Sequence, residues 1–397
     1  MKNLSILILA LLVLSCTKNK INKEHYRNST IISVPVTEEI FPIKLVSDKR
    51  FLPLESKKIN KISSINKITF FNNKILILDK QQNKILLFDS NGKYLSQINY
   101  EGKGPNEYLY LSDFIVNKED NSIELLDRGN RKILKLNDSN LVTNELKFSF
   151  YCDRFLKTKK GEYLFFTNNQ TNKTGSGKES YNLILTDEKA KIINHYLQIP
   201  PEKEELIISE SHSFTPYKLG VNFTLPIDNQ IYYASGDTVG VKYQISFGKC
   251  DVPDDILTPL TSSHQGNKIQ LQMKLMNKIT QAGYAYNIHS VLENDSFLFF
   301  QFRKGMNVNS VLYAKKTKNI KTGVTIINNI DTYFFGQPVA INDKNELITI
   351  LFPYELHDRI KSGNLKNNSS DSELEKLITT IGQFDNPIIQ SFKLSDF

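Results

Sequence analysis

The sequence has few of the residues that most often carry catalysis, metal binding or cross-linking. Its 397 residues include no tryptophan, four methionines, three cysteines and six histidines. It lacks the H-E-x-x-H motif of zinc proteases and the G-x-S-x-G motif of serine hydrolases. Residues 174–179 contain Gly-Lys, but without the spacing and the following Ser or Thr of a phosphate-binding loop. These absences exclude the enzyme classes that the motifs define.

Three cysteines are too few for a disulfide-rich scaffold. Cys16 lies near the start of the chain, so only Cys152 and Cys250 are left to pair with each other. A bridge requires their Cα atoms to lie within about 7 Å, which the sequence does not show. One disulfide and two unpaired thiols are therefore both open, and two buried thiols are the favoured interpretation.

The N-terminus has the pattern of an export signal. Lys2 precedes an apolar run at residues 4–14, which is interrupted only by Ser5 and is followed by Ser15 and Cys16. The run is too short for a membrane span, which needs about 20 apolar residues. Residues 13–16 resemble the lipobox of bacterial lipoproteins, in which the cysteine is acylated. We therefore predict a signal peptide at residues 1–15 and lipidation of Cys16; the alternative is an ordinary cleaved signal.

Residues 16–38 are predicted to form a lipidated N-terminus and a flexible tether. Residues 17–23 are polar and basic without apolar periodicity. Acyl chains add about 0.8 kcal/mol of membrane affinity per buried methylene, so a lipidated Cys16 would hold the chain at a membrane. We expect a bacterial outer-membrane lipoprotein that faces the periplasm or the cell surface. The lack of an acidic run after Cys16 favours the periplasmic side.

Charge gives little information about a partner. The formal net charge is +8, but the lysines are scattered among acidic residues. This pattern favours a solvated surface and no binding of nucleic acid. Anionic membranes or acidic glycans are compatible with the basic balance. The 24 phenylalanines and 18 tyrosines favour strands over a helix bundle.

An internal repeat predicts the fold. Residues 78–88 and 126–136 align without gaps at an offset of 48, and each has a strand that ends in Leu-Asp, a polar turn and a strand that begins Lys-Ile-Leu. A period of 40–50 residues with several short strands is typical of propeller blades, which bury their faces against each other. About six such units fit residues 39–397. We predict an all-β, six-bladed β-propeller, with seven blades as the alternative.

Two segments depart from the β pattern. Residues 268–282 place apolar side chains near helical spacing, and residues 370–373 form a capping box before Leu374, Leu377 and Ile381. The propeller is thus expected to carry one or two short inserted helices, with a polar loop at 361–369 before the second.

The segment at residues 102–108, Gly-Lys-Gly-Pro-Asn-Glu-Tyr, precedes Phe114 and resembles a signature of six-bladed β-propeller lipoproteins that are common in Bacteroidetes. These proteins are distant relatives of NHL-repeat propellers. Residues 236–248 and 385–389 resemble two further segments of that family. The resemblance implies a lipoprotein with six blades, but it implies no activity because most members have none assigned.

The same segment supplies candidate site residues. Glu107 is expected to accept hydrogen bonds from loop amides, and Tyr108 to pack beneath the loop; the alternative is that both contact a ligand at the blade mouth. Arg128 follows the second repeat and is a candidate for a ligand contact or for an ion pair. No catalytic residue and no protein metal ligand is predicted.

Asp79 and Asp127 occupy equivalent points of the two repeats. The favoured interpretation is turn capping, in which the carboxylate accepts hydrogen bonds from the following amides. The alternative is an axial ring of carboxylates that binds Ca²⁺; no other cofactor is expected. The histidines, which are scattered along the chain and individually favour structural roles, are His25, His195, His212, His264, His289 and His357.

Three functions are compatible with these features. The first is a monomeric, non-enzymatic module that binds or scaffolds a glycan, peptide or protein partner while its lipid holds it in the envelope. The second is a metal-dependent hydrolase or lyase with its site on the propeller axis. The third is a structural part of an outer-membrane complex. The missing catalytic motifs favour the first.

Overall fold

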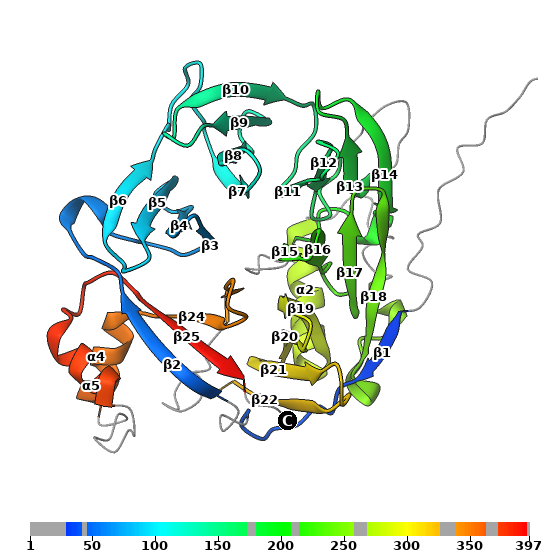
Figure 1. The fold of residues 1–397 in the computed structure, drawn as a ribbon. Coiled ribbons are helices and arrows are strands. Elements are labelled where there is room, and N and C mark those ends of the chain that lie inside the picture. Colours follow the sequence, from blue (N-terminus) through cyan, green and yellow to red (C-terminus); the bar gives the residue numbers. More distant parts are fainter. Residues whose placement is uncertain are drawn as a thin grey trace, which may run out of the picture.

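A computed structural model shows a ring of six β-sheets around a central axis (Figure 1). It describes residues 29–41, 46–172, 180–207, 214–257, 268–325, 338–362 and 372–394. Five sheets have four strands and one has five. The predicted six-bladed β-propeller is thereby confirmed, and seven blades are excluded. The predicted signal peptide, Cys16 and the 174–179 loop lie outside the described residues.

Each blade is an antiparallel sheet whose first strand lies near the axis and whose last strand lies at the rim (Figure 1). Blade 1 contains β3 (Lys67–Phe71), β4 (Lys74–Asp79), β5 (Lys84–Asp89) and β6 (Tyr94–Ile98). Blade 2 contains β7 (Leu111–Asn117), β8 (Ser122–Asp127), β9 (Lys132–Leu136) and β10 (Val142–Lys147). Blade 3 contains β11 (Arg154–Lys157), β12 (Tyr163–Phe166), β13 (Tyr181–Thr186) and β14 (Ile192–Gln198).

The other three blades follow the same order. Blade 4 contains β15 (Phe214–Tyr217), β16 (Gly220–Phe223), β17 (Gln230–Ser235) and β18 (Thr238–Ser246), with β1 (Thr30–Ser33) as its outer fifth strand. Blade 5 contains β19 (Ala285–Glu293), β20 (Phe297–Lys304), β21 (Asn307–Ala314) and β22 (Ile320–Val324). Blade 6 contains β23 (Ala340–Ile341), β24 (Leu347–Leu351), β25 (Ile388–Leu394) and β2 (Val46–Pro53).

The repeat found in the sequence corresponds to β4–β5 and β8–β9, the middle strands of blades 1 and 2. These strands are buried along almost their whole length instead of alternating between buried and exposed residues. The reason is that each blade packs both faces against its neighbours. One apolar cluster joins Leu76 and Leu87 of blade 1 to Phe114 and Leu125 of blade 2. Continuous apolar strands are expected for sheets that are covered on both sides.

The ring has two unequal faces, because the strands within a blade alternate in direction. On one side, which we call the loop face, the second strand of each blade connects to the third, and the fourth strand connects to the next blade. On the opposite side, the turn face, every connection within a blade has two to five residues, such as 72–73, 118–121 and 218–219. The loop face carries the longer connections, including 54–66, 99–110 and the inserted helices.

Residues near the start of the described chain contact three blades, and we call residues 30–41 and 46–53 the strap. Its β1 pairs in parallel with β18 of blade 4, Ile40 forms a parallel bridge with Val324 of blade 5, and β2 pairs antiparallel with β25 of blade 6. The last blade is thus completed by residues from the start of the chain (Figure 1). Because β1 is an ordered strand, the predicted tether at 16–38 ends too late.

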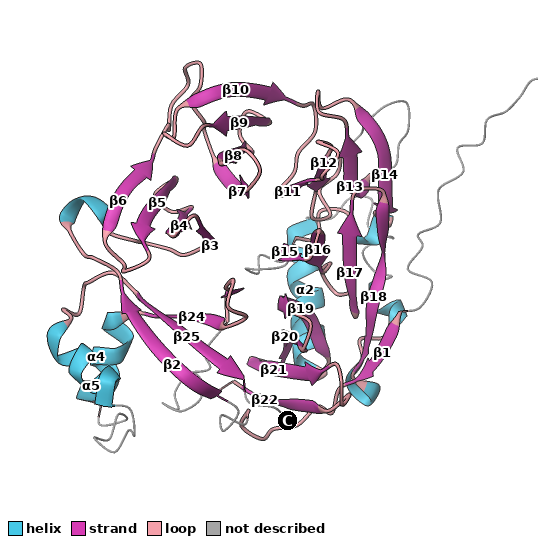
Figure 2. Ribbon diagram, in the orientation of Figure 1, coloured by secondary structure: helices cyan, strands magenta, loops and turns pink. Residues whose placement is uncertain are grey.

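Three α-helices occur in the described residues (Figure 2). The two predicted helices are confirmed as α2 (Lys268–Gln281) and α5 (Ser372–Thr380). The helix α4 (Pro353–Lys361) was not predicted. It packs with α5 against Leu351 and Ile388 of blade 6. The predicted loop at 361–369 lies mostly outside the described residues, and no described helix is long and apolar enough to cross a membrane.

Four short 3-10 helices lie in connections on the loop face: η1 (Lys58–Asn60), η2 (Pro201–Lys203), η3 (Gly248–Cys250) and η4 (Asp254–Leu257). Cys250, at the end of η3, is partly buried, whereas Cys152 is fully buried, and neither thiol is paired. Burial raises the pKa of the Cys152 thiol well above its ordinary value, so this residue stays neutral.

The strap should be sensitive to bulk where it crosses blade 5. A Cβ atom at Gly323 would lie 2.5 Å from the Phe41 backbone nitrogen. We expect Gly323→Val to lower the free energy of unfolding by about 1–3 kcal/mol, because the strap must shift. Denaturant unfolding measures this, with Lys321→Val at an exposed position of the same strand as control. Equal stability of the two variants would contradict the close crossing.

Candidate functional site on the loop face

The two repeat aspartates cap turns, as the favoured interpretation predicted. Asp127 is fully buried, and its carboxylate accepts hydrogen bonds from the backbone amides of Gly129 (2.9 Å) and Asn130 (3.2 Å) in the turn after β8. It also accepts bonds from the amides of Leu109 and Tyr110, both at 3.1 Å, in the connection from blade 1. The carboxylate therefore ties two loops of the loop face together.

Asp79 does the same in blade 1. It is fully buried and accepts hydrogen bonds from the Ser63 amide (2.7 Å), the Ser64 hydroxyl (2.8 Å) and the Gln82 amide (3.1 Å). The oxygens of both aspartates are thus occupied by donors of the chain itself. In the described part of the chain, no three His, Cys, Asp or Glu side chains are grouped so that they could hold a metal ion.

The Gly-x-Gly-Pro-x-Glu-Tyr loop is held by its own side chains. The Gly104 amide donates a hydrogen bond of 2.6 Å to the Glu107 carboxylate. A Cβ atom at Gly102 would lie 2.0 Å from that carboxylate, so a larger residue there would displace the Glu107 side chain. Tyr108 is fully buried and its hydroxyl donates to the Asn83 carbonyl at 2.7 Å. The Tyr108 side chain does not reach the surface, which favours the structural role over a ligand contact.

Arg128 lies on the loop face in the turn after β8. Its guanidinium forms an ion pair of 2.8 Å with Asp153, which belongs to the connection from blade 2 to blade 3. The sequence left open whether Arg128 pairs with an acid or contacts a ligand, and the structure shows the ion pair. About a third of the arginine side chain is still exposed, so a contact with a partner is also open to it.

A group of charges missed in the sequence surrounds this ion pair. Asp113, fully buried, pairs with Lys67 at 2.8 Å. Arg154 donates to the carbonyls of Ser112 (2.8 Å) and Asp153 (3.2 Å). These residues come from the inner strands and loops of blades 1, 2 and 3. The stacking of successive blades brings them together, so the sequence carried no local signal for them.

Lys80 is the most perturbed member of this group. Burial, together with the positive charge of Arg154, lowers the pKa of its ammonium to about 7, against the opposing effect of Asp113 and Asp153. Among the described residues, no acidic side chain lies within ion-pair distance of Lys80. The positive charges of Arg154 and Arg128 both act on this lysine, so additional negative charge here would be stabilising.

A second charge group lies toward the turn face. Glu293, fully buried, contacts the ammonium groups of Lys242 and Lys315, both at 2.5 Å, and accepts a bond from the Tyr243 hydroxyl. Burial lowers the pKa of Lys242 to about 8. Its ammonium also lies 3.6 Å from the centre of the Tyr217 ring. Both ammonium groups contact the same carboxylate, so this network joins blades 4 and 5.

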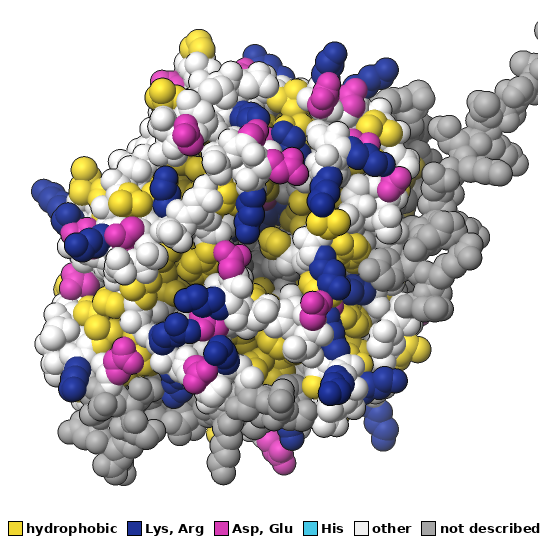
Figure 3. Space-filling model, viewed as in Figure 1, with side chains coloured by type: hydrophobic (Ala, Val, Ile, Leu, Met, Phe, Trp, Pro, Cys, Tyr) yellow, Lys and Arg dark blue, Asp and Glu magenta, His cyan; other side chains and the backbone are white. Residues whose placement is uncertain are grey.

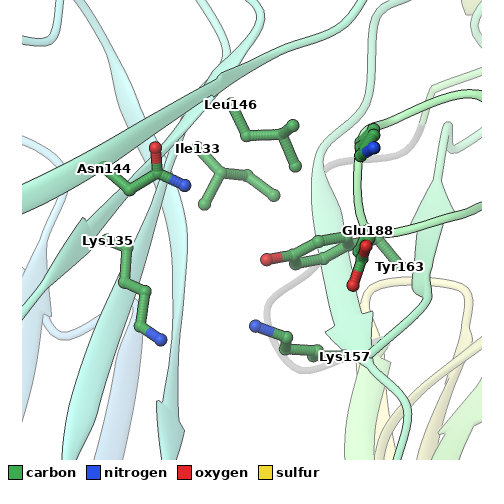
Figure 4. Close-up of a pocket in the computed structure, with 8 residues that line it drawn as sticks. Ile133, Lys135, Asn144, Leu146, Lys157, Tyr163 and Glu188 are labelled. Atoms are coloured by element: carbon green, nitrogen blue, oxygen red, sulfur yellow. The ribbon is translucent and has the colours of Figure 1, made fainter. Parts of the chain in front are cut away.

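Two pockets lie in grooves between blades. One, of about 310 Å³, lies between blades 2 and 3, and the Lys157 ammonium and Tyr163 hydroxyl point into it (Figure 4). Lys157 is bound there by the buried Glu124 at 2.6 Å. The other, of about 180 Å³, lies between blades 1 and 2 and includes Phe71 and Asn121. Because the groove recurs between successive blades, its position follows from blade stacking.

The three described histidines do not form a cluster. His195 lies on the outer strand of blade 3, His289 is buried in the inner strand of blade 5, and the ring of His357 on α4 contacts the Ile381 carbonyl at 2.8 Å. His25, His212 and His264 lie outside the described residues. The individual structural roles expected for histidines fit these three positions.

Exposed apolar side chains gather on the loop face. Ten of the sixteen large apolar residues that are exposed in the described chain lie on its connections and helices: Ile59, Leu109, Tyr110, Tyr151, Ile207, Met273, Met306, Tyr354, Ile360 and Phe384. The turn face carries only Leu141 and Leu219 of this set. On the face that Figure 3 displays, basic and acidic side chains are interspersed around a central hollow.

Comparison with known proteins identifies a family and a fold. A family described as a domain of unknown function (DUF4934) matches residues 33–393. No curated protein matches the chain. A protein from Bacteroides fragilis NCTC 9343, presumed to be exported, is similar over 92% of this chain and 100% of its own, with 22% identity and a TM-score of 0.74. Its likeness shows the propeller fold.

Two further solved structures are similar. A member of the DUF4221 family from Bacteroides vulgatus covers 89% of this chain and 98% of its own, with 9% identity and a TM-score of 0.51. Virginiamycin B lyase from Staphylococcus aureus covers 76% of this chain and 80% of its own, with 14% identity and a TM-score of 0.39.

Removing the Asp127 carboxylate should destabilise the protein. Asp127→Ala leaves four backbone amides without their acceptor and should lower the free energy of unfolding by about 2–3 kcal/mol in a denaturation experiment. Asp138→Ala, in an exposed turn of the same blade, is the control and should change little. If calcium raised the melting temperature of the native chain but not that of Asp127→Ala, this result would favour the calcium interpretation instead.

The lowered pKa of Lys80 predicts that the free energy of unfolding depends on pH. Its pKa is about 7 in the folded chain and ordinary in the unfolded chain, so between these values only the unfolded chain keeps the proton. The lysine therefore costs stability below pH 7, and this cost falls as the pH rises. We expect Lys80→Met to melt at a higher temperature than the native chain at acidic pH, with the difference shrinking at alkaline pH. Lys316→Met, at an exposed turn, should show no such trend.

Proposed function

The chain belongs to the family described as a domain of unknown function (DUF4934), whose description assigns no activity, and from its own surfaces we propose that it is a binding module. In this proposal an exported lipoprotein, anchored in the envelope through Cys16, presents its loop face to a partner and does not transform it. The partner is a protein, peptide or glycan.

The unequal distribution of exposed apolar side chains carries this proposal. Tyr354 is 46% exposed and Met306 is 86% exposed, and both lie on the loop face. Scattered apolar residues are normal on any surface, but their concentration on one face is typical of a surface that contacts another molecule. The helix α4, which presents Tyr354, is an addition to the repeated blade, so the loop face is also where the chain departs from a bare propeller.

Export and anchoring are supported by the signal-like start of the sequence and by the similar Bacteroides protein that is presumed to be exported. Thirteen residues separate Cys16 from Thr30, the first residue of β1. At about 3.5 Å per residue, these would allow the propeller to lie up to roughly 45 Å from a lipid at Cys16. That span leaves the ring free to turn its loop face toward molecules of the envelope.

Site-specific photo-crosslinking in the producing cells tests the proposal. A photoreactive amino acid at Met306 on the loop face should give discrete adducts that mass spectrometry identifies, whereas Leu219 on the turn face, 61% exposed, should give none. Both positions are exposed, so reactivity alone does not separate them. Adducts from Leu219 alone, or from neither position, would rule out a loop-face partner.

The same cells test the anchor. Replacing Cys16 with Ser should remove the acylation site and move the full chain from the membrane fraction to the soluble fraction. An unchanged distribution would mean that the chain is held at the membrane by another interaction, or that Cys16 is not lipidated.

A further inference from the structure

The loop face of blade 2 carries a patch in which exposed tyrosines lie beside cations. We call Leu109, Tyr110, Arg128, Arg131 and Tyr151 the blade-2 patch. Leu109 is 41% exposed, Tyr110 43% and Tyr151 49%. All five belong to the connections that lead into and out of the blade and to the turn between β8 and β9. Tyrosine and arginine are the residues that most often dominate the binding energy of protein interfaces.

The patch is rigid. Asp127 lies beneath it and binds the amides of Leu109 and Tyr110 from one loop and that of Gly129 from the next. The two loops touch, since a Cβ atom at Gly129 would lie 2.8 Å from the Leu109 Cβ atom. The Arg131 guanidinium lies 5.1 Å from the centre of the Tyr151 ring. A partner would therefore meet a preformed surface, which reduces the entropy that binding costs.

The cations in and beside the patch are only partly neutralised. Arg128 is paired with Asp153, and the buried Asp113 is paired with Lys67. Among the described residues, no acidic side chain lies within ion-pair distance of Arg131, Arg154 or Lys80. In the turn-face network, by contrast, each lysine contacts the Glu293 carboxylate. Three cations on one face are thus left to interact with negative charge from outside.

We propose that the blade-2 patch binds an acidic polypeptide segment of an envelope partner. Carboxylates of the segment meet Arg131, Arg154 and Lys80, and an apolar side chain of the segment packs on Leu109 and Tyr110. Guanidinium groups bind carboxylates through two parallel hydrogen bonds, which suits Asp and Glu side chains. This inference rests on the proposed function, because it names the class of partner that the loop face receives.

A carboxylated glycan would supply the same negative charge. It offers sugar rings but no aliphatic or aromatic side chain, whereas the patch combines its cations with an exposed leucine and two exposed tyrosines. This composition is that of the centre of a protein interface, so the polypeptide is the better match. The two partners are separated by the experiment below.

Two synthetic peptides have one central Leu and differ only in that one carries Glu where the other carries Gln. Each is titrated against the full chain, which is purified in detergent. Fluorescence anisotropy of a label on the peptide measures binding. We expect the Glu peptide to bind at least about tenfold more tightly than the Gln peptide, and added salt to weaken it. Equal affinity for the two peptides would overturn the proposal.

Variants locate the binding surface. Arg131→Gln and Tyr110→Ala should each weaken the Glu peptide about tenfold. Matched changes on the turn face, Lys316→Gln and Leu219→Ala, should leave its affinity within about twofold. Thermal unfolding of all four variants shows whether each is folded. Equal weakening by the turn-face pair would mean that net charge, and not this patch, attracts the peptide.

Polygalacturonate in the same assay serves as the glycan probe. If it binds at the patch while the Glu peptide does not, the partner is a carboxylated glycan and the polypeptide proposal fails. If neither probe binds but Met306 still gives adducts in cells, the loop face receives a partner without this patch, so the proposed function stands and only this inference fails. Peptide binding without any loop-face adduct in cells would instead count against the proposed function.

Discussion

The pairing of β2 with β25 is the interaction on which the structure depends. A single blade cannot cover its own two apolar faces, so each blade needs a neighbour on both sides, and the first and last blades find theirs only when the ring is closed. The packing between blades 6 and 1 shows this, since Leu54, Ile348 and Ile389 share a cluster with Ile75 and Ile77. The strap completes blade 6 and thereby keeps both ends of the ring covered.

The fold was largely predictable because it repeats. The Leu-Asp and Lys-Ile-Leu elements of blades 1 and 2 each occupy equivalent strands, and burial on both sides explains why they are continuously apolar. The strand β1 was not predictable, because only one of its four residues is buried and its partner β18 lies some 200 positions away. The helix α4 was also not predictable, because it begins at a proline after an apolar strand and no side chain caps its N-terminus.

The candidate site was predictable only where its residues are close in sequence. Asp127, Glu107 and Tyr108 act on their own or adjoining loops, so local pattern indicated their structural roles. The unpaired cations of three different blades meet only through ring geometry, which no spacing encodes. The rigid carboxylate caps and the exposed tyrosines are parts of one arrangement: buried acids fix the loops, and the fixed loops hold the outer side chains in place.

The strap also sets the order of events when the protein is made. Arg50 and Ser391, which face each other across β2 and β25, are 341 positions apart, so the strand that closes the ring is synthesised long before its partner. Contacts of such long range form late and slowly. In the newly made chain, blade 6 therefore stays incomplete until β25 is available to pair with β2.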